Sequence, residues 1–305
     1  MIDRRHRRLA VALLCLATIA PGSAHGQASE EWRSWNQPVT PFKVFGALHY
    51  VGANDIAVYA FATPEGLIVL DGGFPETAPL VLASLAELGF RIEDVKILLN
   101  SHAHFDHAGG LAELAAKSGA KVFASARDAD QLEAGGKGDF AWGDEGTFPP
   151  VAVDRRLADR ETVTLGGVTL TAHVTAGHTR GCTTWTATLE DGGERREAVF
   201  VCSVSVPDPA AYRLADNPRY PEIADDYAAS YERLRSFAPD LFFAAHGGFF
   251  DLDGKRARLA AGEKAVDVFT DRDGYGAYLD RNERRFRELL SEARAALAAK
   301  PPVSD

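Results

Sequence analysis

One short segment in the first half of the chain concentrates ligand-type side chains and most constrains the fold. The segment from His102 to His107 reads HAHFDH and follows an apolar, strand-like run that ends at Asn100. Residues two apart in an extended chain point to the same side, so His102 and His104 can converge on one metal ion. The turn into a following helix would aim Asp106 and His107 at a second ion. A solvated polar loop is the alternative, but sites in α/β folds form at the C-terminal ends of strands, where this segment lies.

Two later histidines extend the predicted metal site. His178 stands between a glycine and a threonine, and His246 precedes two glycines, each at the end of a predicted strand. Glycine beside a ligand allows the backbone to approach a metal closely. Alone, either histidine would more often be a structural turn residue, but beside the 102–107 cluster we interpret both as ligands. His49 and His173 lie within predicted strands and are left outside the site.

The rest of the chain predicts a single layered α/β domain. Of the 305 residues, 46% are hydrophobic, which is enough for a sizeable core, and no repeat or Pro/Ser-rich linker divides the chain. Strands are predicted at 57–61, 67–70, 95–99, 168–174, 183–189, 198–205 and 241–245. Helices are predicted at 76–88, 110–117, 223–237 and 274–300, the last of them on the surface. This order favours two sheets with helices on their outer faces.

The N-terminus predicts an export signal. An arginine-rich start is followed by an apolar run of 12 residues at 9–20 and then by proline, glycine and small residues. A membrane anchor needs about 20 apolar residues, so we expect a cleaved signal peptide over 1–26, with cleavage after Gly26 or Ala28. The mature protein would be periplasmic without stable membrane attachment, with one domain at 29–300 and a C-terminal tail at 301–305.

The charge balance argues against nucleic acid as a partner. The chain has 33 Lys and Arg against 43 Asp and Glu, and removal of residues 1–26 leaves 29 against 42. A mature chain with a net charge of −13 repels a phosphate backbone.

Together these motifs resemble the metallo-β-lactamase superfamily between about Val44 and Phe250. The segment 102–107 is similar to its signature, and LDGG at 70–73, GHT at 177–179 and HGG at 246–248 match further motifs. The resemblance implies an αβ/βα four-layer sandwich of two mixed β-sheets, with helices on the outer faces and metals between the sheet edges. It also implies two zinc ions per chain. The first would be held by His102, His104 and His178, and the second by Asp106, His107 and His246. Six protein ligands for two ions leave positions open for water, as catalytic zinc requires.

The strand before the last histidine resembles that of class B β-lactamases of subclass B3. Glyoxalases, lactonases and RNA-processing members usually carry there an aspartate that bridges both metals, whereas 198–205 reads AVFVCSVS. The next carboxylate, Asp208, comes only after a proline. Ser203 resembles the serine that subclass B3 has in place of a cysteine ligand. A metal-dependent lactonase or thioesterase and a non-catalytic periplasmic zinc-binding protein are the alternatives.

The resemblance implies hydrolysis of the β-lactam amide by a metal-bound hydroxide, which confers antibiotic resistance. Asp106 would ligate a zinc ion and orient the hydroxide. Ser203 and Ser205 are two apart on one predicted strand and would hold the substrate carboxylate or a zinc-bound water. We also count Ser203 among the catalytic residues. Tyr212 would donate a phenol hydrogen bond to the developing oxyanion. The partner is a small-molecule β-lactam, and we expect a monomer.

Two further features have two interpretations each. Asp71, at a strand end before two glycines, is either a carboxylate that orients the metal loop or a turn-forming aspartate. The glycine-rich segment 135–143, with two exposed-looking aromatic residues, is either a mobile loop over the site or ordinary surface.

The cysteines predict a disulfide. Cys182 and Cys202 are the only cysteines after removal of the signal peptide, and DGG at 191–193 signals a hairpin between them. Folding about Gly192 places residue 182 opposite residue 202, where Cβ atoms about 4.5–5.5 Å apart are near bonding range. An oxidising periplasm favours the bond, and two free buried cysteines are the alternative.

Overall fold

The computed structural model describes residues 30–299. The predicted signal peptide at 1–26, its cleavage positions and the tail at 301–305 lie outside the described residues. Within residues 30–299, no helix is both long enough and apolar enough to cross a membrane.

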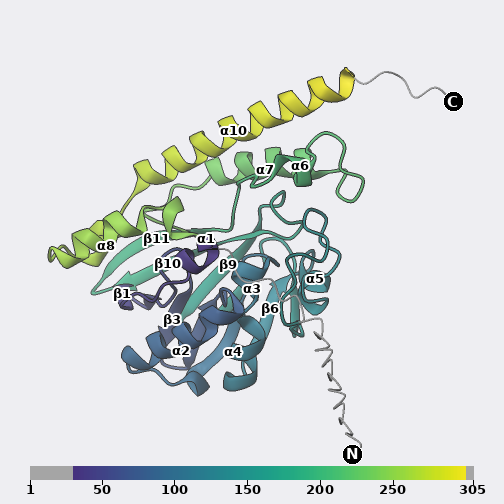
Figure 1. Ribbon diagram of the computed structural model, residues 1–305. Coiled ribbons are helices and arrows are strands. Elements are labelled where there is room, and N and C mark those ends of the chain that lie inside the picture. The colour runs from purple at the N-terminus through teal and green to yellow at the C-terminus, as the bar shows by residue number, and fades with distance from the viewer. Residues whose placement is uncertain (1–29, 300–305) are drawn as a thin grey trace, which may run out of the picture.

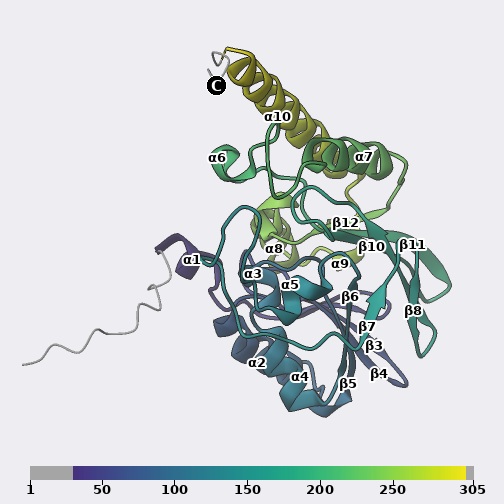
Figure 2. The ribbon, with the colours of Figure 1, turned by 90° about the vertical axis from the view of Figure 1, so that its right-hand side faces the viewer.

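Two mixed β-sheets pack face to face, and helices cover their outer sides (Figures 1 and 2). The strands of the first sheet are β1 (Phe42–Phe45), β2 (Leu48–Tyr50), β3 (Tyr59–Thr63), β4 (Gly66–Leu70), β5 (Val95–Leu99), β6 (Lys121–Ser125) and β7 (Arg155–Leu157). They lie in chain order, antiparallel from β1 to β4 and parallel from β4 to β7. The strands of the second sheet are β8 (Thr162–Leu165), β9 (Val168–Val174), β10 (Thr183–Asp191), β11 (Glu194–Val201) and β12 (Leu241–Ala244). Their order is β12-β11-β10-β9-β8, and the β11–β12 pair is parallel while the others are antiparallel. The predicted sandwich of two mixed sheets is therefore confirmed.

The helices form the outer layers. They are α1 (Glu30–Trp35), α2 (Ala78–Glu87), α3 (Phe105–Ala108), α4 (Leu111–Ser118), α5 (Ala129–Glu133), α6 (Pro209–Tyr212), α7 (Ile223–Arg235), α8 (Leu252–Ala260), α9 (Ala265–Phe269) and α10 (Arg272–Ala298). Short 3-10 turns are η1 (Pro75–Thr77), η2 (Ile92–Asp94) and η3 (Gly247–Phe249). Figure 1 shows α2 and α4 outside the first sheet and α7 and α10 on the opposite side. The predicted surface helix at 274–300 is α10, which buries Tyr275, Tyr278 and Phe286 along one face.

An aromatic core lies between the sheets. Tyr59 and Phe61 on β3 point into it, whereas Ala60 between them belongs to the core layer under α2 and α4. Phe200 on β11 meets both rings, with centroids 4.9 Å from Tyr59 and 5.3 Å from Phe61, and stacks on Phe243 of β12 at 5.0 Å. Burial of each ring contributes roughly 1.5–3 kcal/mol through removal of apolar surface from water. This core fixes the positions of the strand ends relative to one another.

Strand β11 ends at Val201, four residues before the predicted end at 205. The peptide N–H of Cys202 donates to Oγ1 of Thr184 at 3.4 Å instead of to a carbonyl of β10, so the ladder stops there. Residues 202–205 continue as an irregular segment. Ser203 and Ser205 therefore do not share a strand face, yet their Oγ atoms lie 3.1 Å apart.

The structure contains the predicted disulfide between Cys182 and Cys202, with Cα atoms 5.9 Å apart. The predicted register was wrong by one residue, since Trp185 pairs with Phe200. The hairpin turns through both glycines at 192 and 193, which have φ of 58° and 84°, as a two-residue type I′ turn requires. If continued, this register sets residue 182 across from residue 203, so the disulfide links diagonal neighbours just beyond the paired strands.

Removal of this disulfide is expected to lower the free energy of unfolding. The double variant Cys182→Ser, Cys202→Ser should lose roughly 3 kcal/mol, because a bond across a sequence separation of 20 restricts the unfolded chain. Urea denaturation of the variant and the wild type measures the difference. Thiol titration of the denatured, unreduced mature chain should find no free thiol, and two free thiols would contradict the bond.

Candidate metal centre

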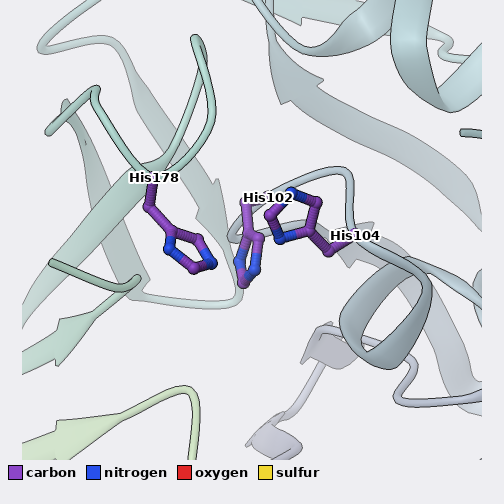
Figure 3. A group of neighbouring side chains, drawn as sticks. All are labelled: His102, His104 and His178. Atoms are coloured by element: carbon purple, nitrogen blue, oxygen red, sulfur yellow. The ribbon is translucent and has the colours of Figure 1, made fainter. Parts of the chain in front are cut away.

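Strand ends from both sheets meet at one edge and carry the predicted ligands. β5 ends at Leu99 and leads into the loop with His102 and His104, after which α3 begins. His178 lies in the connection from β9 to β10, and His246 follows the end of β12. Figure 3 shows the rings of His102 and His104, on one loop, and of His178, on another, turned toward one another.

His102, His104 and His178 form a buried group in which one nitrogen of each lies within 4.8 Å of the others. Burial lowers the pKa of His102 well below its usual value, that of His104 to about 4 and that of His178 to about 3. The three imidazoles are therefore neutral at pH 7 and offer lone pairs. Nε2 of His104 is buried and has no hydrogen-bond partner among residues 30–299. A buried polar atom without a partner is destabilising, and a metal ion would satisfy it.

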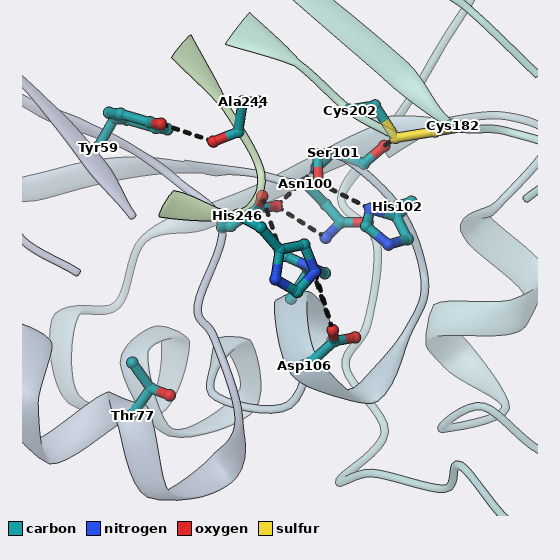
Figure 4. Close-up of polar contacts among 12 residues, drawn as sticks. Tyr59, Thr77, Asn100, Ser101, His102, Asp106, Cys182, Cys202, Ala244 and His246 are labelled. Atoms are coloured by element: carbon teal, nitrogen blue, oxygen red, sulfur yellow. Dashed lines mark hydrogen bonds and ion pairs between the residues drawn. A yellow bond between two sulfur atoms is a disulfide. The ribbon is translucent and has the colours of Figure 1, made fainter. Parts of the chain in front are cut away.

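Asp106, His107 and His246 form a second group. Oδ2 of Asp106 lies 3.3 Å from Nε2 of His107 and 3.4 Å from Nε2 of His246, and the two nitrogens are 3.2 Å apart. Figure 4 shows Asp106 and His246 facing each other in this way. A tetrahedral zinc ion with bonds of about 2.0–2.2 Å holds such ligand atoms about 3.3–3.6 Å apart. The three atoms therefore stand close to the spacing that one zinc ion needs.

Charge complementarity also favours a cation in the second group. Burial alone would raise the pKa of Asp106, but the neighbouring rings of His107 and His246 hold it well below its usual value. For His246, burial lowers the pKa, yet hydrogen bonds and charges from Asp106 and Asp55 outweigh burial and raise it to about 9. The carboxylates thus hold a proton on His246, and a divalent cation can supply that positive charge in its place.

The two groups adjoin at His102. One nitrogen of His102 also lies within 4.8 Å of ligand atoms of Asp106 and His107. The sulfur atoms of Cys182 and Cys202 also lie within 4.8 Å of a His102 nitrogen, but they are bonded to each other and do not compete as ligands. Imidazole nitrogens with a carboxylate are a donor set that suits divalent zinc. The residues present therefore fit the metal that the sequence predicts.

Asp71 braces the ligand loop. Its Oδ1 accepts the N–H of Ser101 at 2.6 Å and the side-chain amide of Asn100 at 3.1 Å. Its Oδ2 lies 3.8 Å from Nδ1 of His107. The backbone of Asp71 has φ of 69°, a left-handed conformation that aspartate tolerates better than most residues. Asp71 therefore does both things that the sequence suggests: its carboxylate orients the ligand loop, and its backbone forms the turn after β4.

Two carboxylates that the sequence analysis missed hold the ligand segments. Asp128, between β6 and α5, is buried and accepts the N–H of Ala103 at 3.1 Å and the hydroxyl of Thr179 at 2.6 Å. It therefore ties the loop around Ala103 to the loop that carries His178. Asp55 contacts the Nδ1 atom of His246 at 2.8 Å. No motif marks either residue, because their partners lie from 25 to 191 positions away.

The predicted substrate-binding residues take different positions. Ser205 lines the cavity at the metal ligands, whereas Ser203 is only 2% exposed and contacts Ser205 from behind. Tyr212 is fully buried, and its hydroxyl donates to the carbonyl oxygen of His178 at 3.0 Å. This geometry does not support the expected phenol donor, because the hydroxyl is engaged by the protein and lies behind the cavity wall. Tyr212 instead holds the loop of His178.

A cavity of about 520 Å³ opens over the ligands, a size suited to a small molecule. Its ligand-bearing floor includes His104, Asp106, His178 and His246. Its aromatic walls are formed by Trp32, Trp35, Phe105, Trp142 and Phe249. The segment 135–143 thus contributes Trp142 to the wall and is not ordinary surface. The other aromatic residue of that segment, Phe140, was wrongly expected to be exposed, since it is buried with its ring 5.3 Å from that of Tyr212.

Comparisons with known proteins agree with this geometry. Residues 51–192 match the sequence model of the metallo-beta-lactamase superfamily. The native FEZ-1 metallo-β-lactamase from Legionella gormanii is 40% identical with a TM-score of 0.82, over 85% of this chain and 98% of that chain. BJP-1, a subclass B3 metallo-β-lactamase of Bradyrhizobium japonicum, is 36% identical with a TM-score of 0.79, over 86% and 98%. Hydroxyacylglutathione hydrolase of Fuscovulum blasticum is 34% identical over 107 residues, which are 35% of this chain. The match spans 33% of that curated relative, about a third of its length.

Zinc is expected to raise the unfolding temperature of the metal-stripped protein. An ion bound by the folded state alone adds about 2.7 kcal/mol when its free concentration is 100 times Kd. His178→Ala should lose the part of the shift that the ion at His102, His104 and His178 contributes, because it removes a ligand atom. Thermal denaturation with and without zinc measures the shift.

The matched control for this measurement is His173→Ala. Nε2 of His173 contacts Oγ1 of Thr186 at 2.9 Å, and His49 likewise contacts the carbonyl of Ala47 at 2.9 Å, so neither histidine belongs to the ligand groups. His173→Ala should keep the full zinc-dependent shift. An equal loss of the shift in both variants would contradict the assignment of His178.

Proposed function

The chain belongs to the metallo-β-lactamase superfamily, and from this premise we propose that it is a zinc-dependent β-lactamase that confers antibiotic resistance. In this proposal the chain is exported to the periplasm after removal of residues 1–26 or 1–28. It then acts as a monomer, with residues 29–300 as its single domain, on small-molecule β-lactams. One observation carries the proposal. The segment after β11 contributes a serine, and no carboxylate, to the lining of the cavity.

The first carboxylate after β11, that of Asp208, caps a helix and does not line the cavity. Oδ1 of Asp208 accepts the N–H groups of Ala210 at 2.8 Å and Ala211 at 3.3 Å, and so caps the start of α6. Ser205 and Pro207 of this segment line the cavity, and Ser205 is the one of the two with a polar side chain. Thioester- and lactone-cleaving members of the superfamily are expected to carry a metal-bridging aspartate on this strand. This segment offers the cavity the hydroxyl of Ser205 and no carboxylate, which supports a β-lactam substrate.

A metal-dependent thioester hydrolase is the second candidate, because the curated relatives are hydroxyacylglutathione hydrolases. That likeness covers 35% of the chain, whereas the likeness to FEZ-1 covers 85% at higher identity. The alignment with FEZ-1 thus extends over most of this chain. It therefore favours the β-lactamase.

We assign two zinc ions to the centre. His102, His104 and His178 would hold the first ion, and Asp106, His107 and His246 the second. Bound zinc acts as a Lewis acid and lowers the pKa of a coordinated water to about 7, so a nucleophile is available at neutral pH.

Asp106 would orient the attacking water. Its carboxylate lines the cavity and is fixed by the imidazoles of His107 and His246, and its low pKa keeps it an anion that accepts a hydrogen bond from water. The water oxygen adds to the lactam carbonyl carbon, the C–N bond breaks, and the ring nitrogen takes up a proton. The product carries a carboxylate and an amine, and no side chain becomes acylated.

Ser205 and the aromatic walls would position the substrate. The Ser205 hydroxyl is available to donate to the substrate carboxylate, and its contact with Ser203 at 3.1 Å restricts its orientation. Trp32, Trp35 and Phe249 offer apolar surface to the substituents of the lactam and displace water from the ligands. Ser203 would therefore act on substrate through Ser205.

The zinc-loaded mature protein is expected to hydrolyse a penicillin, a cephalosporin or a carbapenem. A chelator should abolish this activity and added zinc should restore it. An absorbance assay follows opening of the ring, with a lactone and a thioester as comparison substrates. Cleavage of the lactone or the thioester with all three β-lactams left intact would replace this proposal with the second candidate.

Substitutions should separate substrate positioning from the metal-dependent step. Ser205→Ala is expected to lower kcat/KM by roughly tenfold, mainly through KM, because one hydrogen bond is lost. Ser203→Ala should have a smaller effect in the same direction. Asp106→Ala should lower kcat/KM by about 100-fold or more, because it removes both a ligand and the orienting carboxylate. Steady-state kinetics with zinc content measured in parallel tests this order, and a greater loss in Ser203→Ala than in Asp106→Ala would contradict it.

A further inference from the structure

Asp55 lies in the loop between β2 and β3 and contacts His246 across 191 residues of sequence. Its Oδ2 atom is 2.8 Å from Nδ1 of His246, and its Oδ1 atom accepts the N–H of Gly248 at 2.7 Å. Both carboxylate oxygens therefore face the segment that follows β12. This segment carries one ligand of the second group.

Main-chain contacts join the same two segments without the Asp55 side chain. The N–H of Gly247 donates to the carbonyl oxygen of Asp55 at 2.6 Å, and the N–H of Ala57 donates to the carbonyl of Ala245 at 3.0 Å. A Cβ atom at Gly247 would stand 2.7 Å from the carbonyl oxygen of Asn54, so glycine permits this close approach. A substitution that changes only the side chain of Asp55 leaves this junction in place.

The carboxylate determines which nitrogen of His246 faces the metal position. A neutral imidazole has one N–H, and an ionised carboxylate only accepts hydrogen bonds, so Asp55 keeps the proton on Nδ1. The lone pair is then on Nε2, which lies 3.4 Å from Oδ2 of Asp106 and 3.2 Å from Nε2 of His107. We propose that Asp55 is a positioning residue that fixes the ring and the tautomer with which His246 binds the second ion. Ligand histidines commonly depend on such a partner.

The first group has partners of its own. Nδ1 of His178 contacts the carbonyl oxygen of Ser205 at 3.0 Å, and Nδ1 of His102 contacts Oγ of Ser101 at 3.0 Å. Asp55 therefore acts on the second ion alone. The inference rests on the two-zinc assignment of the proposed function but not on the identity of the substrate.

Selective loss of one ion is the test. Zinc-loaded wild type, Asp55→Asn and Asp55→Ala are dialysed against graded concentrations of a chelator, and the zinc retained per chain is measured by atomic absorption. The wild type should hold two ions. Each variant should hold one ion as tightly as the wild type and release the other at a chelator strength about 10- to 100-fold lower.

Asp253→Asn is the matched control. Asp253 is on α8, a few residues beyond Gly248, its side chain is 82% exposed, and it pairs with Arg256. The substitution removes one negative charge near the same segment without altering the contact to His246. Both ions should be retained as in the wild type.

Asp55→Asn tests whether Asp55 acts through its hydrogen bonds to His246 and Gly248 or only by filling space, because asparagine has nearly the same size. The side-chain oxygen of asparagine can accept a hydrogen bond from either His246 or Gly248, and its NH₂ group then faces the other of these two N–H donors. Asp55→Asn should therefore bind the second ion no better than Asp55→Ala. Retention of both ions at wild-type affinity in these variants would overturn the proposal. Equal weakening of both ions, or circular dichroism showing both variants unfolded, would also overturn it, because Asp55 would then be a general structural residue.

The wild-type measurement keeps the two proposals distinguishable. A wild type that holds a single ion would overturn the two-zinc assignment on which this inference rests. A wild type with two ions and variants unlike the expectation would overturn the role of Asp55 alone. Neither result depends on turnover of a β-lactam.

Discussion

Burial of several imidazoles and a carboxylate at the meeting edge of two apolar sheets governs the rest of this structure. His102 is 1% exposed and His107 is 0% exposed, so their ring nitrogens have almost no access to water. A polar group removed from water is destabilising unless it finds a partner. The protein supplies partners on the outer side of the cluster, where Asp55, Asp71 and Asp128 contact the ligands or their loops. On the inner side the nitrogens face one another, and a cation can satisfy them together.

The sheets can present such a cluster because their strand ends are held rigidly. The aromatic core fixes one sheet on the other, and close backbone contacts fix the loops on the sheets. A Cβ atom at Gly110 would stand 2.2 Å from the carbonyl oxygen of Gly72, and one at Gly72 would stand 2.6 Å from the nitrogen of Leu111. Gly72, after β4, and Gly110, before α4, thus pack directly against each other through their backbones. This contact seats α3, which carries Asp106 and His107, against the end of the first sheet.

Local sequence signals predicted those parts of the molecule whose partners are near in sequence. Strands at 95–99 and 168–174 were predicted with their exact ends, because apolar and β-branched residues alternate or run together there. The density of ligand types at 102–107 predicted the buried cluster of ligand-type side chains that the structure brings together there. The hairpin register was wrong by one residue, because the signal DGG does not say which glycines occupy the turn. Asp55 and Asp128 were missed because an isolated aspartate in a loop carries no information about a partner that only the fold brings near.

The candidate metal ligands and the residues of the cavity wall serve different roles: the ligands would hold the ions, and the wall residues would contact the substrate. The candidate ligands stand on short loops and on α3, next to carboxylates that accept hydrogen bonds from them or from their loops, so a change there disturbs the ligand positions. Part of the cavity wall comes from other segments, since Trp32 and Trp35 stand on α1 and Trp142 stands on the loop before β7, whereas Phe105 and Phe249 stand beside ligands. The ring of Trp142 packs on Tyr212 and that of Trp32 on Phe74 and Phe105, whereas the ring of Trp35 packs edge-on against the ligand His246 at 5.5 Å. A shared ligand cluster with a wall drawn partly from separate segments explains how one superfamily fold can serve several substrates.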